Sequence, residues 1–188
     1  MTTPLEKARK DPESMKARIL TVARRIFGEY GFHGTTTRII AQQVGIDIST
    51  LHYHWGGKKD LYEAVVVDIN KDLGQKLIET EKAIHGLPLT ERLDIAIDRM
   101  TDYLFANPDI SNMILFRYFG KTRYEGNADF SVPEFTADIA RSMGLARDKK
   151  NVPPETMMKV LAVMNSIHAF IAGENFFPSF VFKLKSLG

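Results

Sequence analysis

The stretch TTTRIIAQQVGIDISTLHYHWGGKK, residues 35–59, predicts two short helices joined by a tight turn. The threonine hydroxyls at its start can accept hydrogen bonds from the free backbone N–H groups of a helix N-terminus. Ile40, Ala41 and Val44 then fall on one helical face. Gly45 follows at once, and glycine suits a residue that leaves a helix with positive φ. The first of the two helices is therefore short and amphipathic.

The second helix begins after the turn, where Asp47 or Ser49 can act as its N-cap. Leu51 and Trp55 lie four residues apart and share an inner face. The outer face carries a polar and aromatic set that has no core to enter: Ser49, Thr50, His52, Tyr53 and His54. This helix is therefore predicted to expose a face of side chains that can form hydrogen bonds.

The spacing Ala41-x3-Gly45-x5-Leu51 is the one that a helix-turn-helix requires. A small residue lets the helices approach, a glycine makes the turn, and an apolar residue of the second helix closes the wedge. Such a wedge holds the second helix outward, where it fits a DNA major groove about 12 Å wide. An ordinary corner between two bundle helices is the alternative. The threonine run, the exposed aromatic face and the Lys58–Lys59 pair favour DNA binding.

Residues 35–65, TTTRIIAQQVGIDISTLHYHWGGKKDLYEAV, resemble the DNA-binding domain of the TetR-type transcriptional regulators. Members of that family typically carry T-T-x-x-I-A-x-x-A-G-V-S-x-x-T-L-Y-x-H-F-x-x-K-x-x-L here. The match extends from Ile19 to Val66, and the rest of the chain carries no such likeness. Two positions depart from the pattern: Asp47 replaces a common serine, and His52 stands where tyrosine is usual. The resemblance implies an all-α fold, with a three-helix DNA-binding domain followed by a helical ligand-binding and dimerisation bundle.

The composition is that of an ordinary soluble protein, with 44% hydrophobic and 26% charged residues among 188. No cysteine occurs, which excludes disulfides, thiol nucleophiles and thiolate metal sites. The N-terminus lacks the apolar core of a secretory signal, and the longest apolar stretch is too short to span a bilayer. A cytoplasmic protein without membrane contact is expected. Net charge is +4 over residues 1–60 and −2 over the rest, so the basic excess lies where DNA binding is predicted.

The order of elements predicts three segments. Residues 1–10 are expected to form a flexible basic arm, residues 11–59 the helix-turn-helix domain, and residues 60–188 the ligand-binding and dimerisation domain. A helix from Asp60 to Ile84 would link the two halves. The later expected elements are a helix from Thr90, a helix from Pro108, a polar loop over 120–132, and helices over 134–143, 154–174 and within 176–187.

The residues give little support to catalysis. There is no glycine-rich phosphate loop, nucleophile elbow or cysteine, and the five histidines are scattered. The sequence contains no Glu-x-x-His pair, which argues against a di-iron four-helix bundle. We therefore expect no enzyme activity, cofactor or metal, and a small helical enzyme or carrier is the less favoured alternative for the protein.

The predicted DNA contacts are of two kinds. Phosphate contacts are expected from a helix N-terminus and from exposed hydroxyl, imidazole and ammonium groups: Thr36, Thr37, Tyr53, His54, Lys58 and Lys59. Base contacts are expected from side chains that can reach the edges of base pairs: Arg38, Asp47, Ile48, Ser49 and Thr50. The partner is thus a double-stranded DNA operator. Capping alone would also explain the threonines.

The C-terminal half carries no motif. The resemblance implies a pocket for a small, largely apolar effector, with polar anchors among apolar side chains. The candidates are Met100, Tyr103, Met113, Phe116, Arg117, Asn165 and His168, all of which could equally be core or surface residues. The helix over 154–174 is apolar on nearly all sides, and the resemblance implies a homodimer formed through the last two helices. A regulator without a small-molecule effector is the other possibility.

Overall fold

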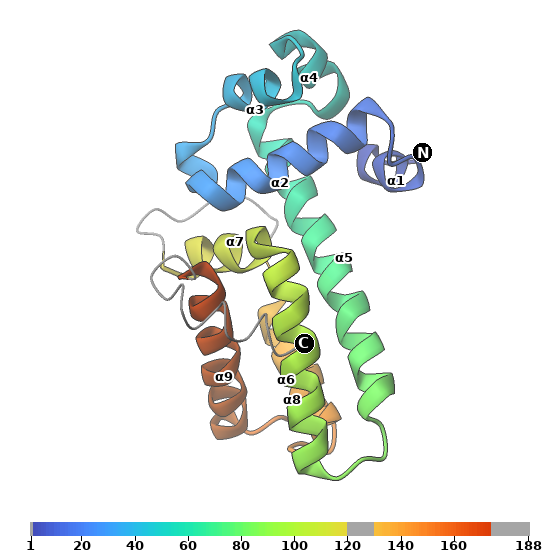
Figure 1. The fold of residues 1–188 in the computed structure, drawn as a ribbon, viewed down its shortest axis with the longest axis vertical. Coiled ribbons are helices and arrows are strands. Elements are labelled where there is room, and N and C mark those ends of the chain that lie inside the picture. The colour runs from blue at the N-terminus through green and yellow to red at the C-terminus, as the bar shows by residue number, and fades with distance from the viewer. Residues whose placement is uncertain (1, 120–129, 174–188) are drawn as a thin grey trace. The chain divides into compact units, whose positions relative to one another are not determined.

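The computed structural model describes residues 2–119 and 130–173. Within these ranges the protein is all-α, with nine helices and no strand, which confirms the predicted fold class (Figure 1). The helices are α1 (Pro4–Lys10), α2 (Met15–Gly34), α3 (Thr37–Val44), α4 (Ile48–Trp55), α5 (Lys58–Ile84), α6 (Leu89–Ala106), α7 (Pro108–Phe119), α8 (Val132–Ser142) and α9 (Pro154–Ala172). The loop predicted near 120–132 falls mostly outside the described residues, and the helix predicted within 176–187 falls wholly outside them.

The chain divides into two compact units. The first contains residues 1–73 and 116–130, and the second contains residues 74–115 and 131–188. Both α5 and α7 therefore contribute to each unit. The domain boundary expected at residue 60 stays a prediction, and residues 60–73 of α5 fall in the first of these two units.

The first unit is built on the amphipathic stripe of α2. Ile19 and Phe27 from this stripe are fully buried, together with Ile40 of α3 and Leu51 of α4. α2 packs against α1, α3 and α4 (Figure 1). The helical path of α2 breaks at Gly31, where φ is 66° and ψ is 178°, so the last residues before α3 change direction.

Residues 4–10 of the segment expected to be a flexible arm form α1. Thr3 and Glu6 form a reciprocal capping box at its start, and Leu5 and Ala8 are buried. Arg9 and Arg24 each bond to both Asp68 and Asp72 of α5, at 2.5 to 2.9 Å. The basic side chain of Arg9 is thus paired within the unit.

In the second unit, α6 and α8 both pack against α9 (Figure 1). One part of its core joins Ile84, Ala96 and Met143, with Ile95 and Ile139 packed around them. No helix in the described part of the chain has the length and hydropathy needed to cross a membrane.

Candidate nucleic-acid interface

The turn between α3 and α4 has the geometry that the sequence predicts. Gly45 has φ 82° and ψ 37°, the left-handed conformation that ends α3. Its N–H and that of Ile46 both donate to the carbonyl oxygen of Ala41, each at 3.0 Å. Ala41 is buried, so the small residue, the glycine and the turn act together to bring α4 close to α3.

α4 is amphipathic, with one buried face and one exposed face, as a helix that enters a DNA groove must be. Leu51 and Trp55 are buried on its inner face, and the Trp55 indole N–H donates to the carbonyl oxygen of Lys16 at 3.2 Å. On the opposite face Tyr53 is 84% exposed, and Ser49 and His52 are also exposed. These side chains are held outward by packing on the other side of the same helix.

The start of α3, which precedes α4 in the sequence, carries further predicted contact residues. Thr36 is the N-cap, and its hydroxyl accepts a hydrogen bond from the N–H of Ile39 at 3.2 Å. Arg38 is exposed and Thr37 is half-buried. Thr35 differs from its two neighbours, because it is buried and its hydroxyl donates to the carbonyl oxygen of Gly31 at 2.7 Å. The threonine run therefore fixes the entry to α3 as well as capping it.

Asp47 is the N-cap of α4. Its carboxylate accepts hydrogen bonds from the Ser49 hydroxyl, from the Thr50 N–H at 2.7 Å and from the Thr50 hydroxyl at 2.9 Å. These bonds, that of Ser49 foremost, lower the pKa of Asp47 to about 2, so the carboxylate stays charged. Three of the predicted base-contacting residues are thus bonded to one another, while Ile48 is half-buried beside them.

Lys58 makes contacts that the sequence did not indicate. Its ammonium donates to the carbonyl oxygens of Phe32 and Thr35, each at 3.0 Å, and lies 4.3 Å from the centroid of the Phe32 ring. The carbonyl groups that follow the break at Gly31 lack helical partners, and Lys58 supplies the donors. Its neighbour Lys59 is exposed. The two lysines of the predicted phosphate-binding pair therefore have different environments.

One residue of this surface was missed by sequence reasoning. Lys16, in the first turn of α2, lies with its Nζ 2.9 Å from Nδ1 of His54. The two are 38 positions apart and meet only because α2 packs on α4, so no local pattern could have indicated the pair.

The candidate ligand residues of the C-terminal half do not share one environment. His168 and Met113 are buried, and Nδ1 of His168 lies 3.0 Å from the hydroxyl of Ser111, itself fully buried. Burial lowers the pKa of His168 to about 4. The remaining candidates are half-buried (Met100, Tyr103, Arg117) or exposed (Phe116, Asn165).

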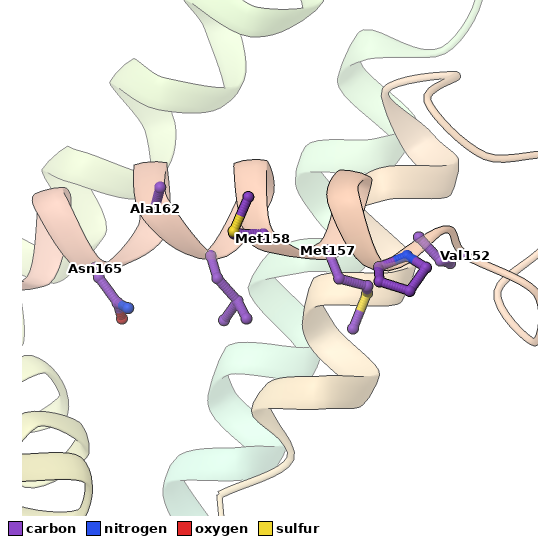
Figure 2. A pocket seen from close by; sticks show the side chains of 7 residues that line it. Val152, Met157, Met158, Ala162 and Asn165 are labelled. Atoms are coloured by element: carbon purple, nitrogen blue, oxygen red, sulfur yellow. The ribbon is translucent and has the colours of Figure 1, made fainter.

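The two exposed candidates, Phe116 and Asn165, lie in different surroundings. The ring of Phe116 lies against Gly31 in the first unit, so close that a Cβ at residue 31 would be 3.3 Å from its Cδ1. Asn165 lines an open groove of about 610 Å³ on α9 (Figure 2). The other lining residues are Val152, Pro154, Met157, Met158, Leu161 and Ala162.

Among the described residues, no three histidine, aspartate or glutamate side chains lie close enough together to hold a metal ion.

Comparison with known proteins agrees with this geometry. Residues 19–65 match the sequence model of the bacterial regulatory proteins of the tetR family. The HTH-type transcriptional regulator UidR of Escherichia coli K12 is 23% identical over 154 residues, which cover 80% of this chain and 76% of UidR. The negative transcriptional regulator IcaR of the Staphylococcus aureus biofilm operon icaADBC is 42% identical over 52 residues, 28% of each chain.

Among solved structures, a Clostridium perfringens protein assigned to the regulation of fatty acid metabolism superposes with a TM-score of 0.68 at 19% identity. The superposition covers 86% of this chain and 87% of that one. The fold and the exposed recognition helix define a helix-turn-helix transcriptional regulator, which is not an enzyme. More narrowly, residues 19–65 carry the DNA-binding domain of the tetR family of bacterial regulatory proteins.

Proposed function

We propose that this regulator is a homodimeric repressor that binds an operator through α3 and α4 and is released from it by a small, largely apolar effector. The exposed face of α4 carries the proposal, because its outward side chains are anchored by buried residues on the opposite face. Two such helices would occupy successive major grooves, roughly 34–36 Å apart.

Within this interface we assign phosphate contacts to Thr36, Thr37, Tyr53, His54 and Lys59, and base contacts to Arg38, Ile48, Ser49 and Thr50. Asp47 is assigned to holding Ser49 and Thr50 in place, since its carboxylate accepts hydrogen bonds from both. Lys58 is assigned to holding the α2–α3 connection, since its ammonium already donates to two carbonyl oxygens.

The dimer is proposed to form through the exposed face of α9. Met158 is 64% exposed and Val163 is 49% exposed, and the open groove lies on the same helix (Figure 2). Between Met158 and Ala172 the only lysine, arginine or acidic residue is Lys159. A helix face with large exposed apolar side chains is typical of a protein interface, and two-fold dimers are the commonest assemblies.

Effector binding is proposed to involve the interior between α7 and α9. The buried pair Ser111–His168 offers polar groups in an apolar setting, with Met113 buried on the same helix as Ser111. α7 also carries Phe116, which contacts Gly31 at the break of α2. A shift of α7, or a tilt of α5, can therefore be transmitted to the helix-turn-helix. The free energy by which the effector shifts the equilibrium cannot exceed the difference between its binding free energies for the two states.

The test begins with selection of genomic DNA fragments by the purified protein. We expect the recovered fragments to share an inverted repeat whose half-sites are about 10–10.5 base pairs apart, or a multiple of that spacing. Tyr53→Ala and Tyr53→Phe should both weaken binding to all sequences alike if the hydroxyl contacts phosphate. Failure to enrich any sequence would contradict the proposal.

A further inference from the structure

Two nitrogen atoms from different helices meet at the edge of the proposed DNA interface. Nζ of Lys16, in the first turn of α2, lies 2.9 Å from Nδ1 of His54, in the last turn of α4. Trp55 donates to the backbone of Lys16 and so fixes the two helix ends relative to each other. The exposed Tyr53 completes the cluster, with its ring 5.2 Å from that of His54 and 6.0 Å from Nζ of Lys16.

The chemistry of the pair determines its protonation. A lysine ammonium is a donor only, so Nδ1 of His54 must accept, and the proton of the neutral ring resides on Nε2. Burial, and then the charge of Lys16, lower the pKa of His54, so the ring is neutral near pH 7. The cluster therefore presents one positive charge and several donors.

Among the described residues, neither Lys16 nor His54 is paired with a carboxylate. α3, which packs on α4, carries one ionisable side chain, Arg38, and α4 itself adds His52 and, at its opposite end, Asp47. The other charged residues of α2 have partners elsewhere: Arg18 at the Val44 carbonyl, Arg24 at Asp68 and Asp72, Arg25 at Gln43, and Glu29 at Arg25. An anion is the group that this cluster lacks.

We propose that Lys16 and His54 together bind one phosphate of the DNA backbone, and that His54 takes up one proton from solvent when they do. The proposal rests on the proposed function. When the ammonium of Lys16 turns toward a phosphate oxygen, Nδ1 loses its donor, and the phosphate charge offsets the repulsion between imidazolium and ammonium. Protonated His54 then donates to the same phosphate.

The experiment measures affinity for a duplex recovered by the genomic selection, at about pH 6 and about pH 8 and at several salt concentrations. Linkage requires that proton uptake strengthen binding as pH falls. We expect the unaltered protein to bind at least about threefold more tightly at the lower pH. His54→Gln should abolish this difference, whereas His52→Gln, on the exposed face of the same helix, should retain it.

Lys16→Met should reduce the slope of log affinity against log salt by about one per bound phosphate and diminish the pH response. Thermal unfolding of each variant checks that the domain is intact. A pH response that survives in His54→Gln, or an unchanged salt slope in Lys16→Met, would overturn the inference while leaving DNA binding established. Absence of any DNA binding by the unaltered protein would instead overturn the proposed function.

Discussion

Helices α4 and α9 both present one face to solvent, and the two faces differ in chemistry. On α4 the exposed side chains are hydroxyl, imidazole and phenol groups, anchored from behind by Leu51 and Trp55. On α9 they are mainly methionine, valine, alanine and small polar residues. The difference indicates different partners: donors suit a polyanion, whereas a mainly apolar face gains most by excluding water against another protein surface.

The sharpest test of this comparison places a charge on the α9 face. Met158→Asp should dissociate the proposed dimer, since burying an unpaired carboxylate in an interface is costly. Loss of the second half-site contact should then weaken operator binding by about 100-fold. Sedimentation and DNA titration measure the two effects.

The matched control is Leu93→Asp on α6, another exposed apolar residue, at 40% exposure. This variant should remain dimeric and bind DNA normally. Dissociation caused by Leu93→Asp and not by Met158→Asp would move the interface from α9 to α6.

The second prediction concerns the contact of Phe116 with Gly31, both within the first unit. Gly31→Ala should lower the free energy of unfolding by about 2–3 kcal/mol, because φ is 66° there and the new Cβ would lie 3.3 Å from Phe116. Gly45→Ala should cost less, about 1 kcal/mol, because φ is 82° but nothing lies within 4 Å. Denaturant unfolding measures both.

A double-mutant cycle separates the two contributions at Gly31. Gly31→Ala should cost less in a Phe116→Ala background than in the unaltered protein, since the steric part is removed and the φ part remains. Equal costs in the two backgrounds would show that Phe116 does not constrain the break of α2.

The third prediction is a pH dependence in the C-terminal unit. The pKa of His168 is about 4 in the folded protein, below its usual 6.5, so between these values the unfolded chain binds more protons. The stabilisation is complete above about pH 6.5 and is lost as pH falls toward 4, by about 3 kcal/mol. The measurement is the free energy of unfolding of the unaltered protein and of His168→Gln, from pH 7 to pH 4. The difference between the two isolates the contribution of His168 from that of the carboxylates, which both proteins share. A constant difference would contradict the assignment.

The helices of the first unit show how far the sequence alone can predict a structure. The caps, turn and inner face of α3 and α4 depend on residues close together in the chain, and the structure places Thr36, Gly45 and Leu51 as predicted. α1 was missed although its Thr3-x-x-Glu6 capping box is equally local. The basic charge of this segment, on which the expectation of a flexible arm rests, does not distinguish a tail from a helix.

Local sequence patterns do not predict contacts between residues that are far apart in the chain. The pairing of Lys16 with His54 requires the packing of α2 on α4, and that of Phe116 with Gly31 requires the path of α7. The prediction of the ligand residues rests on residue type, which does not determine how each helix is rotated about its axis. Asn165 consequently lies exposed while His168, three residues on, is buried.

The last prediction concerns the two adjacent lysines at the start of α5. Lys58→Ala should lower the free energy of unfolding by about 1–3 kcal/mol, because the carbonyl oxygens of Phe32 and Thr35 lose a charged donor. Lys59→Ala should leave stability within about 0.5 kcal/mol, as is usual for an exposed residue, and reduce the salt slope of DNA binding by about one per subunit. Chemical unfolding and salt titration distinguish the two roles. If Lys58→Ala is as stable as the unaltered protein and reduces the salt slope instead, its ammonium leaves the carbonyls for phosphate, and α5 begins with two DNA contacts.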